Sequence, residues 1–400
     1  MTTPSTATAG WRSERPLRIA LVSEPFYPDL GGMPEHVHNL GRELAQRGHR
    51  VTVITTSYPR APRLDLPTAP YDVVRIGRAT SHIVSNGSQH HVAVGLRLRA
   101  QLSALFAERD FDVIHLHGPI FPTLSLLAIH CAPPRAALIG TLHTHFSDSG
   151  LLRLFRRPLQ RYLDALDGVI AVSDSALRSL QHVGLRCAAT RIENGIDLAY
   201  WQGGRAVPTL RDGCFNVLVQ ARLEPRNDVA TVLAALRHLP DPPSVRLIVV
   251  GDGPDLSRLQ RASSGLNVQF VGSQLQGRAD LAASADAYFF TATIASHPMS
   301  LLEGMAAGLP TLAFDIEGVR GLLGDGVEGF VLPLGDAARV AERLWTLRQD
   351  PALCRTLGTA AQQQAQAFAW PRIAEQVLAF YEQTRAASGG DARAESRSAG

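Results

Sequence analysis

The amino-acid sequence predicts an α/β protein made of two doubly wound, Rossmann-like domains. Its 400 residues are too many for one ordinary hydrophobic core, so two domains are expected. Short, nearly continuous apolar runs alternate with helical patterns, which is typical of parallel strands covered by helices on both faces. The series of runs is interrupted by a Gly- and Pro-containing segment, 201–209. We therefore place the domain boundary at this segment, near Gly203.

The expected strands fall into two series, one for each domain. Those of the first domain are Leu17–Ser23, Val51–Thr55, Val113–His117, Ala137–Leu142 and Val169–Val172. Those of the second domain are Phe215–Ala221, Val245–Val250, Val268–Val271, Ala287–Phe290, Thr311–Phe314 and Gly329–Leu332. The carboxyl ends of parallel strands form the usual ligand-binding edge of such sheets. We expect the two domains to face a shared central cleft along these edges.

The domain limits follow from composition. Residues 1–15 are rich in Thr, Ser, Ala and Pro and are expected to be disordered, as is the tail 386–400. The first domain should span 16–202 and the second 203–369, followed by a helix over 370–385.

Composition excludes several classes of protein. No apolar run approaches the roughly 20 residues of a membrane span, and the N-terminus lacks the apolar core of a signal peptide. The 4 cysteines are scattered without metal-binding or disulfide spacing, so we expect reduced core thiols of a cytoplasmic protein. A net charge of +3 is too small to indicate nucleic-acid binding. The sequence contains no lysine, so arginine supplies all 39 basic residues, which excludes a P-loop and any lysine Schiff base, including one with pyridoxal phosphate.

Ala295–Glu303 is the segment most informative about function. Ser300 and Glu303 have the spacing of a capping box, in which both side chains satisfy amide groups at a helix N-terminus. The helix that follows is rich in small residues and leads into the strand at Thr311. Capping is the structural interpretation of Glu303, and a ligand-binding role is the alternative.

Other polar residues stand where strands or turns end. Gly31 and Gly32 let the backbone approach a ligand, and the helix behind them presents free amides. Three His-x-His pairs occur, at 36/38, 115/117 and 143/145, and two histidines on one face of a strand can bind a metal. No carboxylate or cysteine lies nearby at ligand spacing, so we expect no metal.

A basic stretch has two open interpretations. Arg153, Arg156, Arg157 and Arg161 lie at helical spacing with interleaved apolar residues. Such a helix can lie on an anionic membrane, or it can be a solvated helix with a buried stripe. Pro158 argues against one continuous helix.

Taken together, these segments resemble the family-4 retaining glycosyltransferases of GT-B fold, and most closely the phosphatidylinositol mannosyltransferase-like branch. The resemblance covers about 17–381 and rests on motifs in the expected order: the glycine loop, Thr141-Leu-His-Thr, Glu193-Asn-Gly-Ile-Asp197, Arg222, Val250–Pro254, Phe270–Gly272 and the E-x7-E-like segment ending at Glu303. It implies transfer of a hexose from a nucleotide-diphosphate sugar to a hydroxyl of a lipid or glycan acceptor, with retention and without a cofactor. It also implies that helix 370–385 crosses back to the first domain, and that the protein works at the inner face of the membrane.

The resemblance assigns a role to each matching residue. His143 would contact the transferred sugar and Glu303 the ribose, as the catalytic pair. The donor diphosphate would be bound by Gly31, Gly32, Arg222, Arg226 and Asn227. The donor sugar and ribose region would be Ala295, His297, Pro298, Met299, Ser300 and Glu303, and the base-binding turn Val271 and Gly272. The acceptor side would be His115, His117, Arg153, Arg156 and Arg157.

Two of these positions depart from the family pattern. Ala295 replaces the first glutamate of E-x7-E, and Asn227 replaces the lysine that neutralises the diphosphate. Either the chemistry continues with weaker or different donor contacts, or the protein is a degenerate relative that acts as a binding or partner subunit. The GT-B sugar-nucleotide epimerases share the architecture, but they lack the E-x7-E-like segment and the N-G-I-D turn. Oligomeric state, nucleotide, sugar and acceptor are left open by the sequence.

Overall fold

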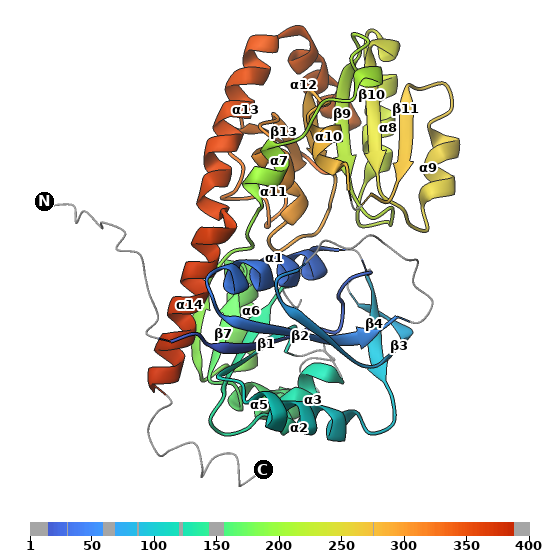
Figure 1. The fold of residues 1–400 in the computed structure, drawn as a ribbon. Coiled ribbons are helices and arrows are strands. Elements are labelled where there is room, and N and C mark those ends of the chain that lie inside the picture. Colours follow the sequence, from blue (N-terminus) through green and yellow to red (C-terminus); the bar gives the residue numbers. More distant parts are fainter. Residues whose placement is uncertain are drawn as a thin grey trace, which may run out of the picture.

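The computed structural model describes residues 15–29, 31–58, 69–85, 88–119, 123–143, 156–274 and 276–387. Two parallel sheets, one for each half of the chain, form the architecture that the sequence predicts (Figure 1). The predicted disordered tails lie largely outside these residues. Arg15 is described, and it pairs with Asp112 through a 2.8 Å contact.

The first half is an 8-stranded sheet in the order β4-β3-β2-β1-β5-β6-β7-β8, in which only the β3–β4 pair is antiparallel. Its strands are β1 (Arg18–Val22), β2 (Arg50–Ser57), β3 (Asp72–Ser85), β4 (Ser88–Val94), β5 (Val113–His117), β6 (Ala137–Leu142), β7 (Gly168–Ala171) and β8 (Ala188–Arg191). Its helices are α1 (Gly32–Gln46), α2 (Leu98–Arg109), α3 (Leu124–Cys131), α5 (Arg156–Asp164) and α6 (Asp174–Val183). In β1, β5, β6 and β7 almost every side chain is buried, because apolar layers lie on both faces.

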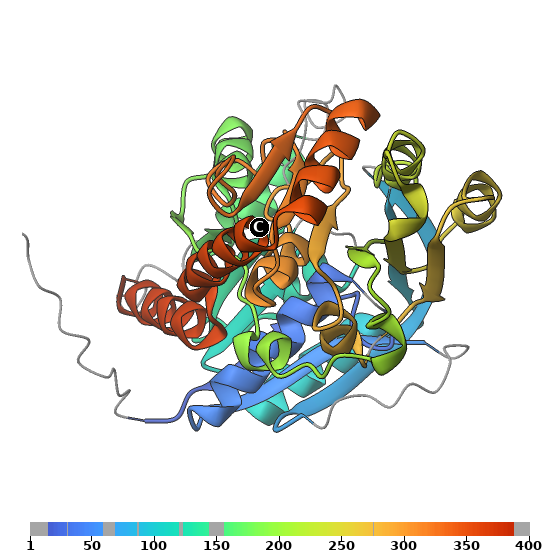
Figure 2. The ribbon, with the colours of Figure 1, turned by 90° about the horizontal axis from the view of Figure 1, so that it is seen from above.

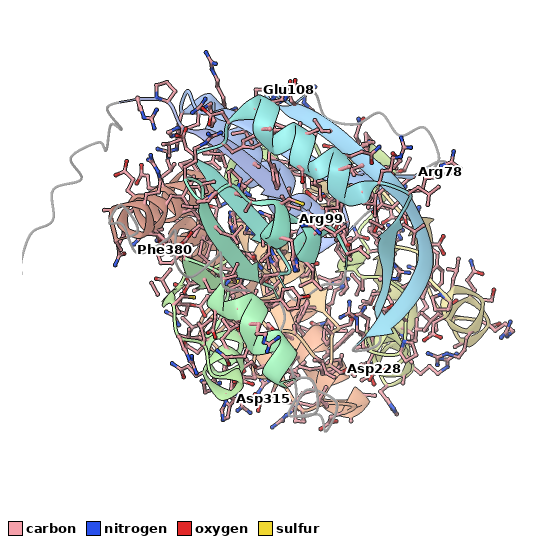
Figure 3. All side chains as sticks on the ribbon, turned by 90° about the horizontal axis from the view of Figure 1, so that it is seen from below. Arg78, Arg99, Glu108, Asp228, Asp315 and Phe380 are labelled. Carbon is pink, nitrogen blue, oxygen red and sulfur yellow. The ribbon has the colours of Figure 1, made fainter. Side chains whose placement is uncertain are left out.

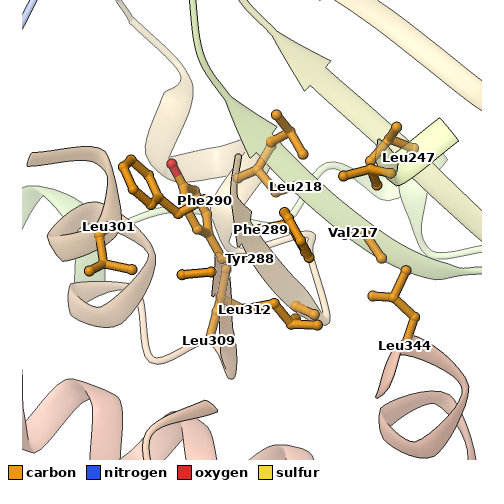
Figure 4. Packing of buried hydrophobic residues seen from close by; sticks show 14 of the residues in the cluster. Val217, Leu218, Leu247, Tyr288, Phe289, Phe290, Leu301, Leu309, Leu312 and Leu344 are labelled. Carbon is orange, nitrogen blue, oxygen red and sulfur yellow. The ribbon is translucent and has the colours of Figure 1, made fainter. Parts of the chain in front are cut away.

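The second half is a 6-stranded parallel sheet in the order β11-β10-β9-β12-β13-β14. Its strands are β9 (Phe215–Gln220), β10 (Val245–Val250), β11 (Val268–Gly272), β12 (Ala287–Phe290), β13 (Thr311–Phe314) and β14 (Gly329–Leu332). Its helices are α7 (Leu198–Gln202), α8 (Val229–Arg237), α9 (Leu256–Ala262), α10 (Arg278–Ala282), α11 (Met299–Ala306), α12 (Ala337–Gln349) and α13 (Pro351–Ala365). One apolar core, which includes Phe289, Leu301 and Leu312, joins the sheet to its helices (Figure 4). Helix α7 ends at Gln202, before the boundary expected near 203, and it packs against α10 and α11 of the second half.

The last helix, α14 (Trp370–Ala387), leaves the second half and packs against α1 and β6 of the first (Figures 1 and 2). Its buried side chains, among them Ile373, Val377 and Tyr381, join the core of the first sheet. Figure 3 labels Phe380 on this helix. Its ring approaches Gly168 at the start of β7, where an added Cβ would lie 2.8 Å from the ring. No helix among the described residues is both long and apolar enough to cross a membrane.

Candidate active site between the two sheets

The glycine loop of the first half lies against the start of α11 in the second. Gly31 and Gly32 lead into α1, and a Cβ built on Gly32 would be 3.7 Å from the Met299 sulfur. Met299 is the first residue of α11. The predicted diphosphate loop and the predicted donor-sugar segment are therefore neighbours across the junction of the two halves.

Glu303 is a buried carboxylate on α11, with only 7% of its surface exposed. The helix begins after Pro298 and no side chain caps it, so the capping-box interpretation of Ser300 and Glu303 is wrong. Glu303 Oε1 instead accepts a 3.2 Å hydrogen bond from Arg278 Nη1. Burial raises the pKa of Glu303 to about 7, although the Arg278 charge opposes this shift. Its charge is therefore sensitive to pH near neutrality.

Arg278 links the two halves through a carboxylate on each side. It is the first residue of α10, and its Nη2 donates a 2.8 Å hydrogen bond to Glu35 Oε1 in the first turn of α1. Its guanidinium carbon lies 5.4 Å from the Trp201 ring centroid, a cation–π contact. Burial opposes its charge, but Glu303 and Glu35 together raise the pKa of Arg278. Arg278 is thus a permanent cation beside Glu303. The sequence reasoning missed Arg278.

The predicted diphosphate arginines are held by one glutamate. Glu224 is 4% exposed, and its two oxygens contact Arg222 Nε at 3.3 Å and Arg226 Nε at 2.5 Å. Both contacts use the nitrogen nearest the aliphatic stem of the arginine. Glu224 therefore fixes both guanidinium groups from the stem side, at the loop that follows β9.

Asn227 and Ala295, the two positions that we expect to depart from the pattern of the resembled family, have ordinary local roles. Asn227 Nδ2 donates a 2.8 Å hydrogen bond to the Arg222 carbonyl, so its amide folds back onto the loop. Ala295 is partly buried against the core of the second half. The two segments are connected, because the Arg226 carbonyl accepts hydrogen bonds from Thr293 N and Oγ1 at 2.8 and 3.0 Å.

Four histidines gather at the carboxyl edge of the first sheet. His36 comes from α1, His115 and His117 from β5, and His143 follows β6. The His36 and His143 ring centroids are 4.7 Å apart, and His117 Nδ1 lies 3.1 Å from His143 Nε2. Burial lowers the pKa of His36 to about 4 and of His115 to about 3, and it lowers the pKa of His117 and His143 well below their usual range. All four are neutral at pH 7.

Three members of this cluster, His36, His117 and His143, come one from each His-x-His pair, which the spacing argument did not foresee. His36, His117 and His143 offer ligand nitrogens that all lie within 4.8 Å of one another, an arrangement that could hold a metal ion. All three residues already have protein partners: His36 Nδ1 contacts Asn194 Oδ1 at 3.0 Å, and His117 and His143 contact each other. His38 instead faces Tyr71, and residue 145 lies outside the described ranges.

Asn194 connects the histidine cluster to the donor-sugar segment. Its Nδ2 donates a 3.0 Å hydrogen bond to the His297 carbonyl, so its Oδ1 faces His36. Because an amide oxygen only accepts, His36 carries its proton on Nδ1. The His297 ring is buried 5.6 Å from that of Phe368, and neither ring nitrogen has a partner among the described residues. Burial lowers the pKa of His297 to about 3.

The remaining predicted positions are placed as follows. Gly272 has a φ of 72°, which favours glycine, and the Val271 carbonyl accepts from Gln274 Nε2 at 2.8 Å. Arg153 lies outside the described residues; Arg156 and Arg157 begin α5, which also contains Pro158, and their side chains are outside the description. The membrane-helix interpretation is therefore untested.

A second buried carboxylate lies on the first-half side. Glu24 follows β1 and is 2% exposed; its Oε1 accepts hydrogen bonds from the Thr123 hydroxyl and from Leu124 N at the start of α3. Its Oε2 has no partner among the described residues. Burial raises the pKa of Glu24 to about 7. Sequence reasoning missed this residue, because a single acid after a strand is no recognisable signal.

Comparison with known proteins gives the chain its family. Residues 30–200 match the model for Glycosyltransferase Family 4, and residues 205–364 match that for Glycosyl transferases group 1. A phosphatidyl-myo-inositol mannosyltransferase of Mycolicibacterium smegmatis is 31% identical over 92% of this chain and 94% of its own length. A GDP-mannose-dependent alpha-mannosyltransferase of Mycobacterium tuberculosis is 28% identical over 92% of this chain and 97% of its own length.

Solved structures show the same fold. Anabaena HepE in complex with UDP and glucose is 21% identical, with a TM-score of 0.72 over 92% of this chain and 100% of that chain. A sucrose-phosphate synthase from Thermosynechococcus elongatus is 22% identical, with a TM-score of 0.71 over 93% of this chain and 100% of that one. At these identities the likeness concerns the fold, which is the GT-B arrangement of two facing α/β halves.

Proposed function

We propose, because this chain belongs to glycosyltransferase family 4, that it transfers a hexose from a nucleoside-diphosphate sugar to a hydroxyl of a lipid or glycan acceptor with retention of configuration. One observation carries the assignment of the donor site: the glycine loop of the first half lies against the start of α11, which also holds the buried carboxylate Glu303. The donor then binds across the junction, with its ribose at Glu303 and its diphosphate between the glycine loop and Arg222.

The residues of the site supply electrostatic positioning. Arg222 and Arg226, fixed at their stems by Glu224, present planar cations to the phosphate oxygens and stabilise the leaving diphosphate. His143, neutral at pH 7, hydrogen-bonds a hydroxyl of the transferred sugar. The leaving phosphate oxygen takes the proton of the attacking acceptor hydroxyl on the same face of the sugar, which gives retention without a protein base.

We assign neutralisation of the diphosphate to arginines and to no metal. The histidine cluster could hold a cation, and treatment with a chelator distinguishes the two cases. Transfer that continues at an unchanged rate after dialysis against EDTA supports the arginine assignment. Loss of activity that Zn²⁺ restores would overturn it.

The names of the relatives indicate the first substrates to try. GDP-mannose is the donor named for one relative and phosphatidyl-myo-inositol the acceptor named for another, whereas a structural neighbour binds UDP and glucose. A lipid acceptor would bring the protein to the cytoplasmic face of an anionic membrane. The four arginines within residues 153–161 support that placement. Co-sedimentation with vesicles containing phosphatidylinositol tests it, with neutral phosphatidylcholine vesicles as the control.

The second candidate is a binding or partner subunit without turnover. Two observations favour it: Ala295 has no polar atom for the donor sugar, and the Asn227 amide is engaged with the Arg222 carbonyl. A lost charge-assisted hydrogen bond costs about 1.5–3 kcal/mol, which is about ten- to a hundredfold in rate or affinity.

One experiment separates the two candidates. The pure protein is incubated with UDP-, GDP-, ADP- and dTDP-sugars, with and without lipid acceptors, and both nucleotide release and thermal stabilisation are measured. The transferase predicts stabilisation by one nucleotide class and release that depends on an acceptor. Stabilisation without release, with every acceptor tried, supports the binding subunit. If no nucleotide sugar binds or turns over, the transferase fails and only a partner subunit without a donor site remains.

A further inference from the structure

Arg278 stands between the two halves, in contact with the carboxylate that we assign to the ribose. Its Nη1 lies 3.2 Å from Glu303 Oε1 and its Nη2 lies 2.8 Å from Glu35 Oε1. The side chains of Arg278 and Glu35 are each 17% exposed and that of Glu303 is 9% exposed, so water screens these contacts weakly. The Trp201 ring covers the guanidinium from α7.

Arg278 offsets one of the two carboxylate charges in this cluster. Two carboxylates share one guanidinium, and the Glu35 charge itself raises the pKa of Glu303. Without the cation, Glu303 and Glu35 would face each other as like charges in a partly dry junction. The chain could relieve this by protonating Glu303 or by separating the two halves. Either response removes a carboxylate from the place where a ribose would meet it.

The geometry leaves Glu303 ready for a ligand. Arg278 engages Oε1, and Oε2 accepts no hydrogen bond from the described part of the chain. An ionised carboxylate accepts hydrogen bonds from the ribose hydroxyls on either oxygen, whereas protonation turns one oxygen into a donor and removes the negative charge. On the other side, Glu35 lies in the first turn of the helix that begins with the glycine loop.

We propose that Arg278 is a positioning residue: it holds Glu303 as an oriented carboxylate for the ribose hydroxyls of the donor and, through Glu35, couples that contact to the glycine loop beside the diphosphate. This role rests on the proposed function, because it assigns the ribose to Glu303. Arg278 also supplies a cation to a donor site in which Asn227 has replaced the usual lysine.

The titratable groups around Glu303 allow a pH test. They are Arg278 from α10, Glu35 from α1 and Tyr288 from β12, and Arg278 in turn faces Tyr27 and Tyr200. Burial raises the pKa of Tyr288 and of Tyr27, so both stay neutral in the range tested. Burial lowers the pKa of the nearby His36 to about 4, below that range.

The experiment measures binding of GDP-mannose and UDP-glucose, and of their 2′-deoxyribose analogues, by calorimetry from about pH 5.5 to about pH 8.5. Nucleotide sugars are chosen because their diphosphates carry no proton that titrates in this range. The variants are Arg278→Met, Arg278→Lys, Glu35→Gln and Glu303→Gln. Arg339→Met, which removes an exposed arginine on α12, is the matched control.

Arg278→Met is expected to weaken binding at least about tenfold at pH 7 and to move the pH midpoint of binding upward. It should also abolish the preference for ribose over 2′-deoxyribose. Arg278→Lys should restore most of that preference. Glu35→Gln should move the midpoint downward, because it removes the like charge, and Glu303→Gln should abolish both the midpoint and the ribose preference.

Opposite shifts in Arg278→Met and Glu35→Gln cannot come from a general loss of structure, so they distinguish positioning from folding. Equal midpoints and an equal ribose preference in wild type and Arg278→Met would overturn the inference while leaving the proposed function standing. Failure of the wild type to bind any nucleotide sugar would overturn both. If Arg278→Met does not fold, the downward shift in Glu35→Gln and the midpoint and ribose preference of Arg278→Lys, each compared with the wild type, still decide the question.

Discussion

The contact between Gly195 and Trp370 gives a prediction in which the structure sets the magnitude. Gly195 lies in the N-G-I-D turn, and a Cβ added there would come 2.6 and 2.8 Å from Trp370 Cε3 and Cε2. Its backbone is outside the left-handed region, so alanine costs nothing in φ and the effect is steric. Trp370 is 1% exposed and its ring packs 5.1 Å from that of His36, so the indole has little room to move. Overpacking of this kind costs about 1–3 kcal/mol.

We expect Gly195→Ala to lower the free energy of unfolding by about 2 kcal/mol, measured by denaturant titration. The displaced indole would press on His36, whose Nδ1 is bonded to Asn194, so the affinity for nucleotide sugar should fall as well. A double-mutant cycle with Trp370→Phe tests the cause, because phenylalanine lacks part of the indole. The double variant should lose at least about 1 kcal/mol less than the sum of the single variants. Additivity within about 0.5 kcal/mol would refute the steric explanation.

Three further predictions concern other residues. Burial raises the pKa of Glu24 to about 7, so between about pH 4.5 and about pH 7 the folded protein keeps this carboxyl protonated while the unfolded chain ionises it. The contribution of Glu24 to the free energy of unfolding therefore declines as the pH rises through this range. Glu24→Gln should therefore gain about 2–3 kcal/mol over the wild type between pH 5 and pH 8 in urea unfolding, and an equal difference at both pH values would contradict the assignment. Tyr381→Phe removes the 2.6 Å partner of the buried His115 Nδ1 and should cost about 1–3 kcal/mol, with nucleotide binding unchanged. Ala295→Glu combined with Asn227→Lys should raise turnover about tenfold or more if the natural site is weakened, whereas a fall in turnover would indicate a specialised donor site.

The strands were predictable where both faces of a sheet are buried. Runs such as Ala137–Leu142 are continuous in apolar residues, and the structure confirms them as strands. The hairpin of β3 and β4 escaped prediction because β3 carries polar and charged residues, and β4, which pairs antiparallel with it, forms the edge of the sheet. Strand β8 escaped because its short sequence, Ala-Ala-Thr-Arg, is largely exposed and has no apolar signal.

The candidate site was predictable only where a residue belongs to a recognisable motif. Glu303 and Arg222 were assigned to the candidate site through resemblance, since a lone glutamate or arginine carries no chemical signature. Arg278 was missed because its partners, Glu35 and Glu303, come from opposite halves and meet only in the folded chain. Glu224 was missed for a related reason: its link to two arginines depends on the path of the loop after β9.

The return of α14 to the first sheet has a consequence for how the protein is made. The core of that sheet includes Trp370, Ile373 and Tyr381, which the ribosome synthesises after the whole second half. A fragment ending at residue 202 would leave an apolar face uncovered and should aggregate, whereas the same fragment supplied with α14 as a separate peptide should stay dispersed. During translation, the first half stays incomplete until the last helix emerges. The two halves are therefore one unit of biosynthesis, although each has its own sheet.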